Sequence, residues 1–127
     1  MPLELDATVL IVDDDDMVRD SLKALLEAHR IRVRDFSSAK EYLAYRDGVG
    51  LRCLVLDMHM PEMGGLELLQ QLRQSGDSIP VVAITGRNDP VLEARAIALG
   101  ASAVLDKPIS HKVLFAAINQ ALAARPS

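Results

Sequence analysis

The sequence predicts a doubly wound α/β fold, in which one parallel five-stranded sheet lies between two layers of helices. Short apolar runs alternate strictly along the chain with segments of helical periodicity. Most of these runs are apolar at consecutive positions, which is typical of parallel strands buried on both faces. The 127 residues suffice for one packed core, and we expect residues 1–127 to form a single domain.

Composition excludes several classes of protein. The net charge is −4, so the overall field does not favour nucleic acid, and we expect no direct contact with it. No apolar run approaches the ~20 residues of a membrane span, and residues 1–6 lack the features of a secretion signal. Cys53 stands alone, which rules out an internal disulfide and fits a reducing compartment. We therefore expect a cytoplasmic protein with no membrane partner.

The first predicted strand, Thr8–Val12, follows a short lead-in and is apolar and β-branched. It runs into four aspartates, Asp13–Asp16, whose carboxylates repel one another unless something offsets the charge. The last two of these acids fit the start of a helix that ends near residues 29–30, since acids there cap a helix and complement its dipole. The first two fit a bound cation, although capping alone is the commoner explanation of such a run.

The next strand and helix are more exposed. Ile31–Phe36 alternates between polar and apolar residues, which predicts a strand with one solvated face. Two serines then cap a short helix, Ala39–Tyr45. The run Cys53–Leu56 is continuously apolar and predicts a buried strand with Asp57 at its carboxyl end. Sites in open α/β sheets are built at that edge.

The second half of the chain repeats the pattern. A turn-rich stretch, Pro61–Gly65, leads into a helix with a leucine stripe, and Ile79–Ile84 is the fourth strand. Thr85 follows this strand, and Pro90 suits the first turn of a helix that runs to Leu99.

The last strand is Ala101–Leu105, and Ser110 caps a final helix over about residues 110–124. Five strands that alternate with five helices predict right-handed crossovers. The size and this alternation indicate the flavodoxin-like (βα)5 class, with strand order 2-1-3-4-5.

Polar residues follow four of the predicted strands. They are Asp13 and Asp14 after the first strand, Asp57 after the third, Thr85 after the fourth and Lys107 after the fifth. There is no glycine-rich phosphate loop of either common type. The set suits Mg²⁺, which takes oxygen ligands and keeps several waters. With a cation, a lysine and a hydroxyl to neutralise a phosphoryl group, a carboxylate can act as nucleophile and form an aspartyl-phosphate.

Four short motifs carry a resemblance to a known family. They are Val12-Asp13-Asp14, Leu56-Asp57-Met58-His59-Met60-Pro61, Ile84-Thr85-Gly86 and Lys107-Pro108. In this order and spacing they resemble the receiver domain of bacterial two-component response regulators, over essentially the whole chain. The likeness is strongest to the FixJ-like subgroup.

The resemblance implies a role for each acid at the sheet edge. Asp57 would accept a phosphoryl group from a sensor histidine kinase or a phosphotransfer protein. Asp13, Asp14 and Asp57, with the backbone carbonyl of His59, would hold Mg²⁺ or Mn²⁺.

The resemblance implies further contacts to the phosphoryl group. Lys107 would pair with its oxygens, and Thr85 would hydrogen-bond it and report its arrival. The backbone N–H groups of His59 and Gly86 would also face it. The bond before Pro108 would be cis, which aims Lys107 into the site.

The sequence departs from the family pattern at several positions. Gly64 stands where an acid is common, and Ile109 stands where phenylalanine is usual. Val104 occupies the switch position, where an aromatic ring usually swings inward as the threonine moves. His59 and Arg87 flank the expected phosphoryl site, at positions that influence phosphoryl lifetime in the family.

The resemblance implies a phosphorylation-switched signalling module, not a turnover enzyme. It implies an output domain or protein partner, regulation of transcription, and a partner surface on the fourth helix, fifth strand and fifth helix that can also serve a homodimer. The chain ends soon after the last helix, so we expect a stand-alone receiver or one excised from a longer regulator. Two alternatives remain. The first is a degenerate receiver that works without phosphorylation, and the second, ranked lower, is an aspartyl-phosphate phosphatase.

Overall fold

The computed structural model describes residues 7–45, 50–86 and 89–123 and confirms the predicted fold. One sheet has the strand order β2-β1-β3-β4-β5, with every neighbouring pair parallel. The strands are β1 (Thr8–Val12), β2 (Arg32–Phe36), β3 (Arg52–Asp57), β4 (Val81–Thr85) and β5 (Ala103–Asp106). The helices are α1 (Asp16–Ala28), α2 (Ala39–Tyr45), α3 (Gly65–Gln74), α4 (Pro90–Ala98) and α5 (His111–Ala123).

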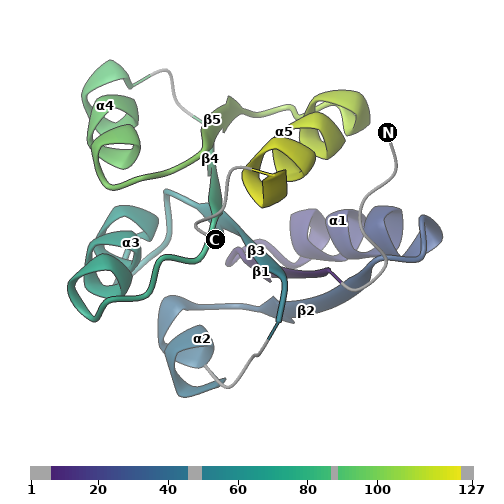
Figure 1. Cartoon of the computed structure of the whole chain (residues 1–127), viewed down its shortest axis with the longest axis horizontal. Helices are drawn as coiled ribbons and strands as arrows, with labels where there is room; N and C mark the ends of the chain where they lie inside the picture. Colours follow the sequence, from purple (N-terminus) through teal and green to yellow (C-terminus); the bar gives the residue numbers. More distant parts are fainter. Residues whose placement is uncertain (1–6, 46–49, 87–88, 124–127) are drawn as a thin grey trace.

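The helices cover the sheet in two layers (Figure 1). Helices α1 and α5 lie on one side of it, and α2, α3 and α4 lie on the other. Because side chains alternate along a strand, each strand supplies both apolar cores. Cys53 and Val55 of β3 face α1 and α5, whereas Leu54 and Leu56 face the other layer. This two-sided burial is why the central strands read as continuous apolar runs.

Polar side chains begin the helices where the sequence predicts it. The Asp15 carboxylate accepts hydrogen bonds from the N–H groups of Met17 and Val18 at the start of α1. Ser38, Asp89 and Ser110 accept equivalent bonds at α2, α4 and α5. These bonds satisfy N–H groups that have no partner within the helix.

The predicted starts of the last two strands are wrong by two residues each. Pro80 has no N–H group to offer a sheet ladder, and β4 begins only at Val81. The N–H of Ala101 bonds back to the carbonyl of Ala96, so this residue still closes α4, and β5 begins at Ala103. The final helix begins one residue later than predicted, since Ser110 is its cap, and position 124 lies outside the described residues.

The connection from β3 to α3 is tight. A Cβ atom on Gly65 would overlap the carbonyl oxygen of Asp57, so α3 can begin this close to the strand end only with glycine. Gly64 donates its N–H to Glu67 Oε1 at 3.3 Å. This connection fixes the backbone around Asp57 on one side of the sheet edge.

No described helix combines the length and the apolar character that crossing a membrane requires.

Candidate functional site

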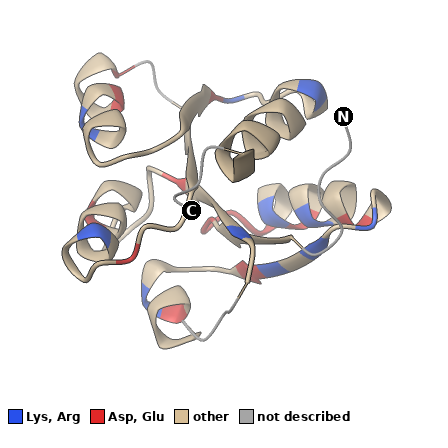
Figure 2. Cartoon of the chain, in the orientation of Figure 1, with Lys and Arg blue, Asp and Glu red and all other residues tan. Residues whose placement is uncertain are grey.

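The carboxyl ends of the strands bring the predicted polar residues to one edge of the sheet. Asp13 and Asp14 directly follow β1, and Asp57 is the last residue of β3. Figure 2 shows the acidic run after β1 as a red segment that leads into α1. Thr85 ends β4, and Lys107 follows β5. The parallel topology alone explains this gathering, because all five strands point the same way.

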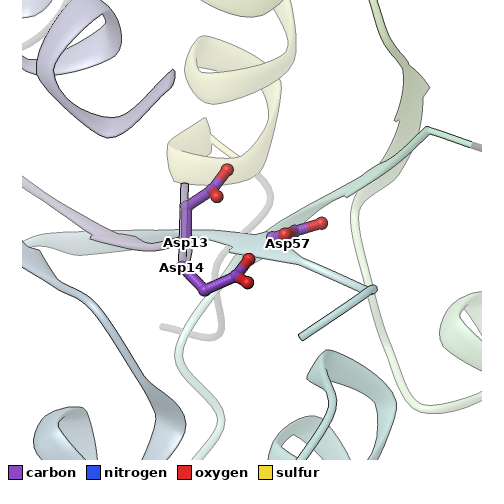
Figure 3. A group of neighbouring side chains, drawn as sticks. All are labelled: Asp13, Asp14 and Asp57. Atoms are coloured by element: carbon purple, nitrogen blue, oxygen red, sulfur yellow. The ribbon is translucent and has the colours of Figure 1, made fainter. Parts of the chain in front are cut away.

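Asp13, Asp14 and Asp57 form a cluster that can hold a metal ion (Figure 3). One carboxylate oxygen from each lies within 4.8 Å of the others. Asp13 and Asp57 are 1% and 3% exposed, whereas Asp14 is open to solvent. Three acids this close, two of them buried, favour a hard divalent cation with room for its waters.

Each buried carboxylate is oriented by a backbone amide two residues further along. The N–H of Asp15 donates to Asp13 Oδ1 at 2.8 Å. The N–H of His59 donates to Asp57 Oδ1 at 3.1 Å. Asp13 Oδ2 is buried and accepts no hydrogen bond from the described residues. The orientation therefore leaves a buried oxygen without a hydrogen bond, 3.9 Å from Lys107 Nζ, and a bound cation would satisfy it.

Burial makes the charged forms of these acids costly. It raises the pKa of the Asp57 carboxyl to about 6, and the negative charge of Asp13 adds to the shift. Burial likewise raises the pKa of Asp13. The negative charge of the cluster is thus incompletely neutralised, and a divalent cation would neutralise more of it.

Lys107 brings a positive charge to the buried acids of the cluster. Its Nζ lies 3.8 Å from Asp57 Oδ1 and 3.9 Å from Asp13 Oδ2, so it faces both buried acids. Its backbone N–H donates to the Thr85 carbonyl at 2.9 Å, and the following bond to Pro108 is cis, as the resemblance implies. A Cβ atom on Gly86 would lie 3.7 Å from Lys107 Cδ, so the glycine lies beside the lysine stem.

Sequence reasoning missed the partner of the His59 side chain. His59 Nε2 lies 2.8 Å from the Thr85 hydroxyl oxygen, which joins the loop after β3 to the end of β4. Thr85 is 2% exposed, so this contact lies in the interior of the sheet edge. No local signal could have found it, since the two residues lie 26 positions apart.

Arg19 is a second residue that the sequence analysis did not single out. Its guanidinium donates to the Asp13 carbonyl at 2.7 Å and to Asp35 Oδ2 at 3.1 Å, and it also pairs with Asp16. It ties α1 to the ends of β1 and β2 and offsets part of the acidic run. An arginine three residues after Asp16 on a predicted helix was the available signal.

Two other predicted positions are less informative. Val104 is half-buried on β5, lies opposite Ala83 and packs against the core that α2, α3 and α4 cover. It brings no polar group to the site. Arg87 lies outside the described residues.

Comparisons with known proteins agree with this geometry. A family model described as the response regulator receiver domain matches residues 9–119. The response regulator protein TmoT of Ectopseudomonas mendocina is 36% identical over 95% of this chain, and the transcriptional regulatory protein FixJ of Rhizobium meliloti is 38% identical over 91%. These matches cover 55% of TmoT and 57% of FixJ, so the chain spans about half the length of these relatives.

Solved structures show the same likeness. The crystal structure of FixJ-N superposes with a TM-score of 0.88 at 36% identity, covering 96% of this chain and 98% of that chain. The structure of the response regulator StyR superposes with a TM-score of 0.87 at 41% identity, covering 94% of this chain and 60% of that one.

Proposed function

The chain belongs to the response regulator receiver domain family of two-component systems, and from this we propose that it is a signalling domain switched by phosphorylation of Asp57. The observation that carries the proposal is the Asp13, Asp14 and Asp57 cluster with Lys107 facing both of its buried acids. This arrangement can bind a divalent cation and a phosphoryl group side by side.

Asp13, Asp14 and Asp57 would hold Mg²⁺ or Mn²⁺, with the His59 carbonyl as a further ligand. The bound cation would neutralise charge on the carboxylates and on incoming phosphoryl oxygens. The buried Asp13 Oδ2, which has no hydrogen-bond partner among the described residues, supports this assignment.

Asp57 would act as the nucleophile. One carboxylate oxygen forms a bond to phosphorus while the bond from phosphorus to the donor's histidine nitrogen breaks, and the electron pair stays on that nitrogen. Lys107, 3.8 Å from Asp57, would stabilise the negative charge of the transferred group. The Thr85 hydroxyl and the Gly86 N–H would bind its other oxygens. The transfer modifies Asp57 of this chain itself, which fits a phosphoacceptor and not a turnover enzyme.

The partners would be a histidine kinase or phosphotransfer protein on the input side and an output domain or protein on the other. The FixJ relatives are named as transcriptional regulatory proteins, so transcription is the output that we propose. A partner or homodimer surface on the α4–β5–α5 face is supported by three apolar residues of α4 and α5 that are 49–69% exposed, Val91, Ile97 and Val113.

The test is the intact mass of the protein after incubation with a small phosphodonor, with and without Mg²⁺. We expect one phosphoryl adduct that requires Mg²⁺ and is absent from Asp57→Asn. An adduct that persists in Asp57→Asn would move the acceptor to another residue. No adduct on the folded wild type would favour a degenerate receiver. Continuous release of phosphate from simple esters would favour a phosphatase.

A further inference from the structure

The contact between the His59 imidazole and the Thr85 hydroxyl has no part in holding a cation or in the chemistry at Asp57. His59 is half-buried, and its ring nitrogen Nε2 lies 2.8 Å from Thr85 Oγ1. The backbone of the same residue donates to Asp57 Oδ1. A single residue thus contacts both the acceptor carboxylate and the hydroxyl proposed to bind the phosphoryl group.

The strand pattern places Thr85 and Asp57 on opposite faces of the sheet. Thr85 lies two residues after Ala83 and so faces the same side of the sheet, towards the core under α2, α3 and α4. Asp57 lies two residues after Val55 and so faces the core under α1 and α5. The Thr85 hydroxyl must therefore turn towards Asp57 before it can bind a group attached there, and the contact with His59 opposes that turn.

We propose that His59 is a positioning residue, whose imidazole holds the Thr85 hydroxyl in its unphosphorylated place and releases it when Asp57 is modified. This inference rests on the proposed function of Asp57 and deepens it, since it names what restrains the switch in this chain. A contact made only in one of two states biases the equilibrium towards that state. Removal of the imidazole therefore favours the phosphorylated arrangement.

The test is the affinity for beryllium fluoride, a phosphoryl analogue, with saturating Mg²⁺ at one fixed pH. Replacement of His59 by Leu should tighten binding by about 3- to 10-fold, the range for one net hydrogen bond. His59→Gln can place a nitrogen where Nε2 lies and should keep wild-type affinity. His59→Asn is one methylene shorter and should behave like His59→Leu. His29→Asn, at the far end of α1, controls for the loss of a histidine.

A double-mutant cycle separates positioning from a general effect of the ring. In a Thr85→Val background, which keeps the shape and removes the hydroxyl, His59→Leu should leave the affinity for beryllium fluoride within about 1.5-fold. The side-chain ¹⁵N signals of His59 should also move on Thr85→Val, which shows that the two side chains are in contact in solution.

The outcomes distinguish the inference from the proposed function. If beryllium fluoride binds in an Asp57-dependent way but His59→Leu leaves its affinity unchanged or weaker, the positioning role is wrong and the receiver function stands. The positioning role is also wrong if His59→Leu acts equally in the Thr85→Val background. If wild type does not bind the analogue, or binds it equally in Asp57→Asn, the proposed function fails and this inference fails with it.

Discussion

The two halves of the sheet edge differ in how firmly they are built. On the β1–β3 side, β3 is buried from Cys53 to Asp57, and α3 buries four residues against it, Gly65, Leu68, Leu69 and Leu72. On the β4–β5 side, β4 and α5 are well buried, but no residue of β5 is buried and α4 buries Ala96 alone. The part of the edge formed by β3 and α3, which carries Asp57, is anchored, and α4 with β5 in the other half is loosely packed.

This difference suits a switch. In the proposed function, the ligand geometry at Asp13 and Asp57 would have to be in place before a phosphoryl group arrives, because positioning and charge neutralisation would provide the catalysis. The part that responds must instead rearrange for a small free-energy change, and elements with few buried apolar contacts do so most readily. Substitutions in each half can show whether the two are as unequal as their packing indicates.

The largest effect should come from matched truncations on the two helices. Leu69→Ala on α3 removes a fully buried side chain and should lower the free energy of unfolding by about 2–5 kcal/mol. Leu92→Ala on α4 removes a partly buried one and should cost about 1–2 kcal/mol. Urea titrations of both variants measure this, and equal costs would show that α4 is anchored as firmly as α3.

Much of this architecture could be predicted from the sequence. Continuous apolar runs identify strands buried on both faces, and in a parallel sheet the residue after each run must lie at one edge, which is how Asp13, Asp57 and Lys107 could be grouped. The His59 contact with Thr85 could not be predicted, because it depends on a side-chain rotamer reaching across two loops. The bonds of Arg19 to Asp13 and Asp35 depend likewise on how α1 docks.

The second prediction concerns the pH dependence of the anchored half without metal. Burial raises the Asp57 pKa from 3.8 to about 6, so the folded state binds a proton more tightly than the unfolded chain. The stabilisation from this proton is complete below the unfolded pKa and is lost as pH rises through about 6. Metal-free stability should therefore fall over this range by about 1–3 kcal/mol.

Thermal unfolding in a chelator measures this loss, in a series from about pH 4 to about pH 7.5 that spans the titration of Asp57. Asp57→Asn should flatten the profile, because an amide does not titrate. Saturating Mg²⁺ should restore stability at the higher pH, since the cation binds the ionised cluster. A wild-type profile that rises steadily with pH in the chelator would contradict the assigned direction of the pKa.

A smaller effect is expected for the exposed member of the cluster. Asp14→Ala removes one of the three carboxylates and should weaken Mg²⁺ binding by about tenfold. Asp20→Ala removes an equally charged and exposed acid from α1, outside the cluster, and should leave the affinity within about twofold. Calorimetric titration with Mg²⁺ compares the two variants. Equal losses of affinity would show that Asp14 acts only through its negative charge and not as a ligand.

The smallest chemical effect should follow a change in the loosely packed half. Val104 lies on β5, opposite Ala83 and away from the acid cluster, so Val104→Tyr should change the phosphorylation rate by less than about twofold. The half-buried site has to make room for a ring beside α4, so the substitution should shift affinity for an output partner or a second copy of the chain. Phosphorylation kinetics and analytical ultracentrifugation, with and without beryllium fluoride, measure both. If the rate changes and assembly does not, residue 104 is coupled to the chemistry, and the division between an anchored and a responsive half is drawn in the wrong place.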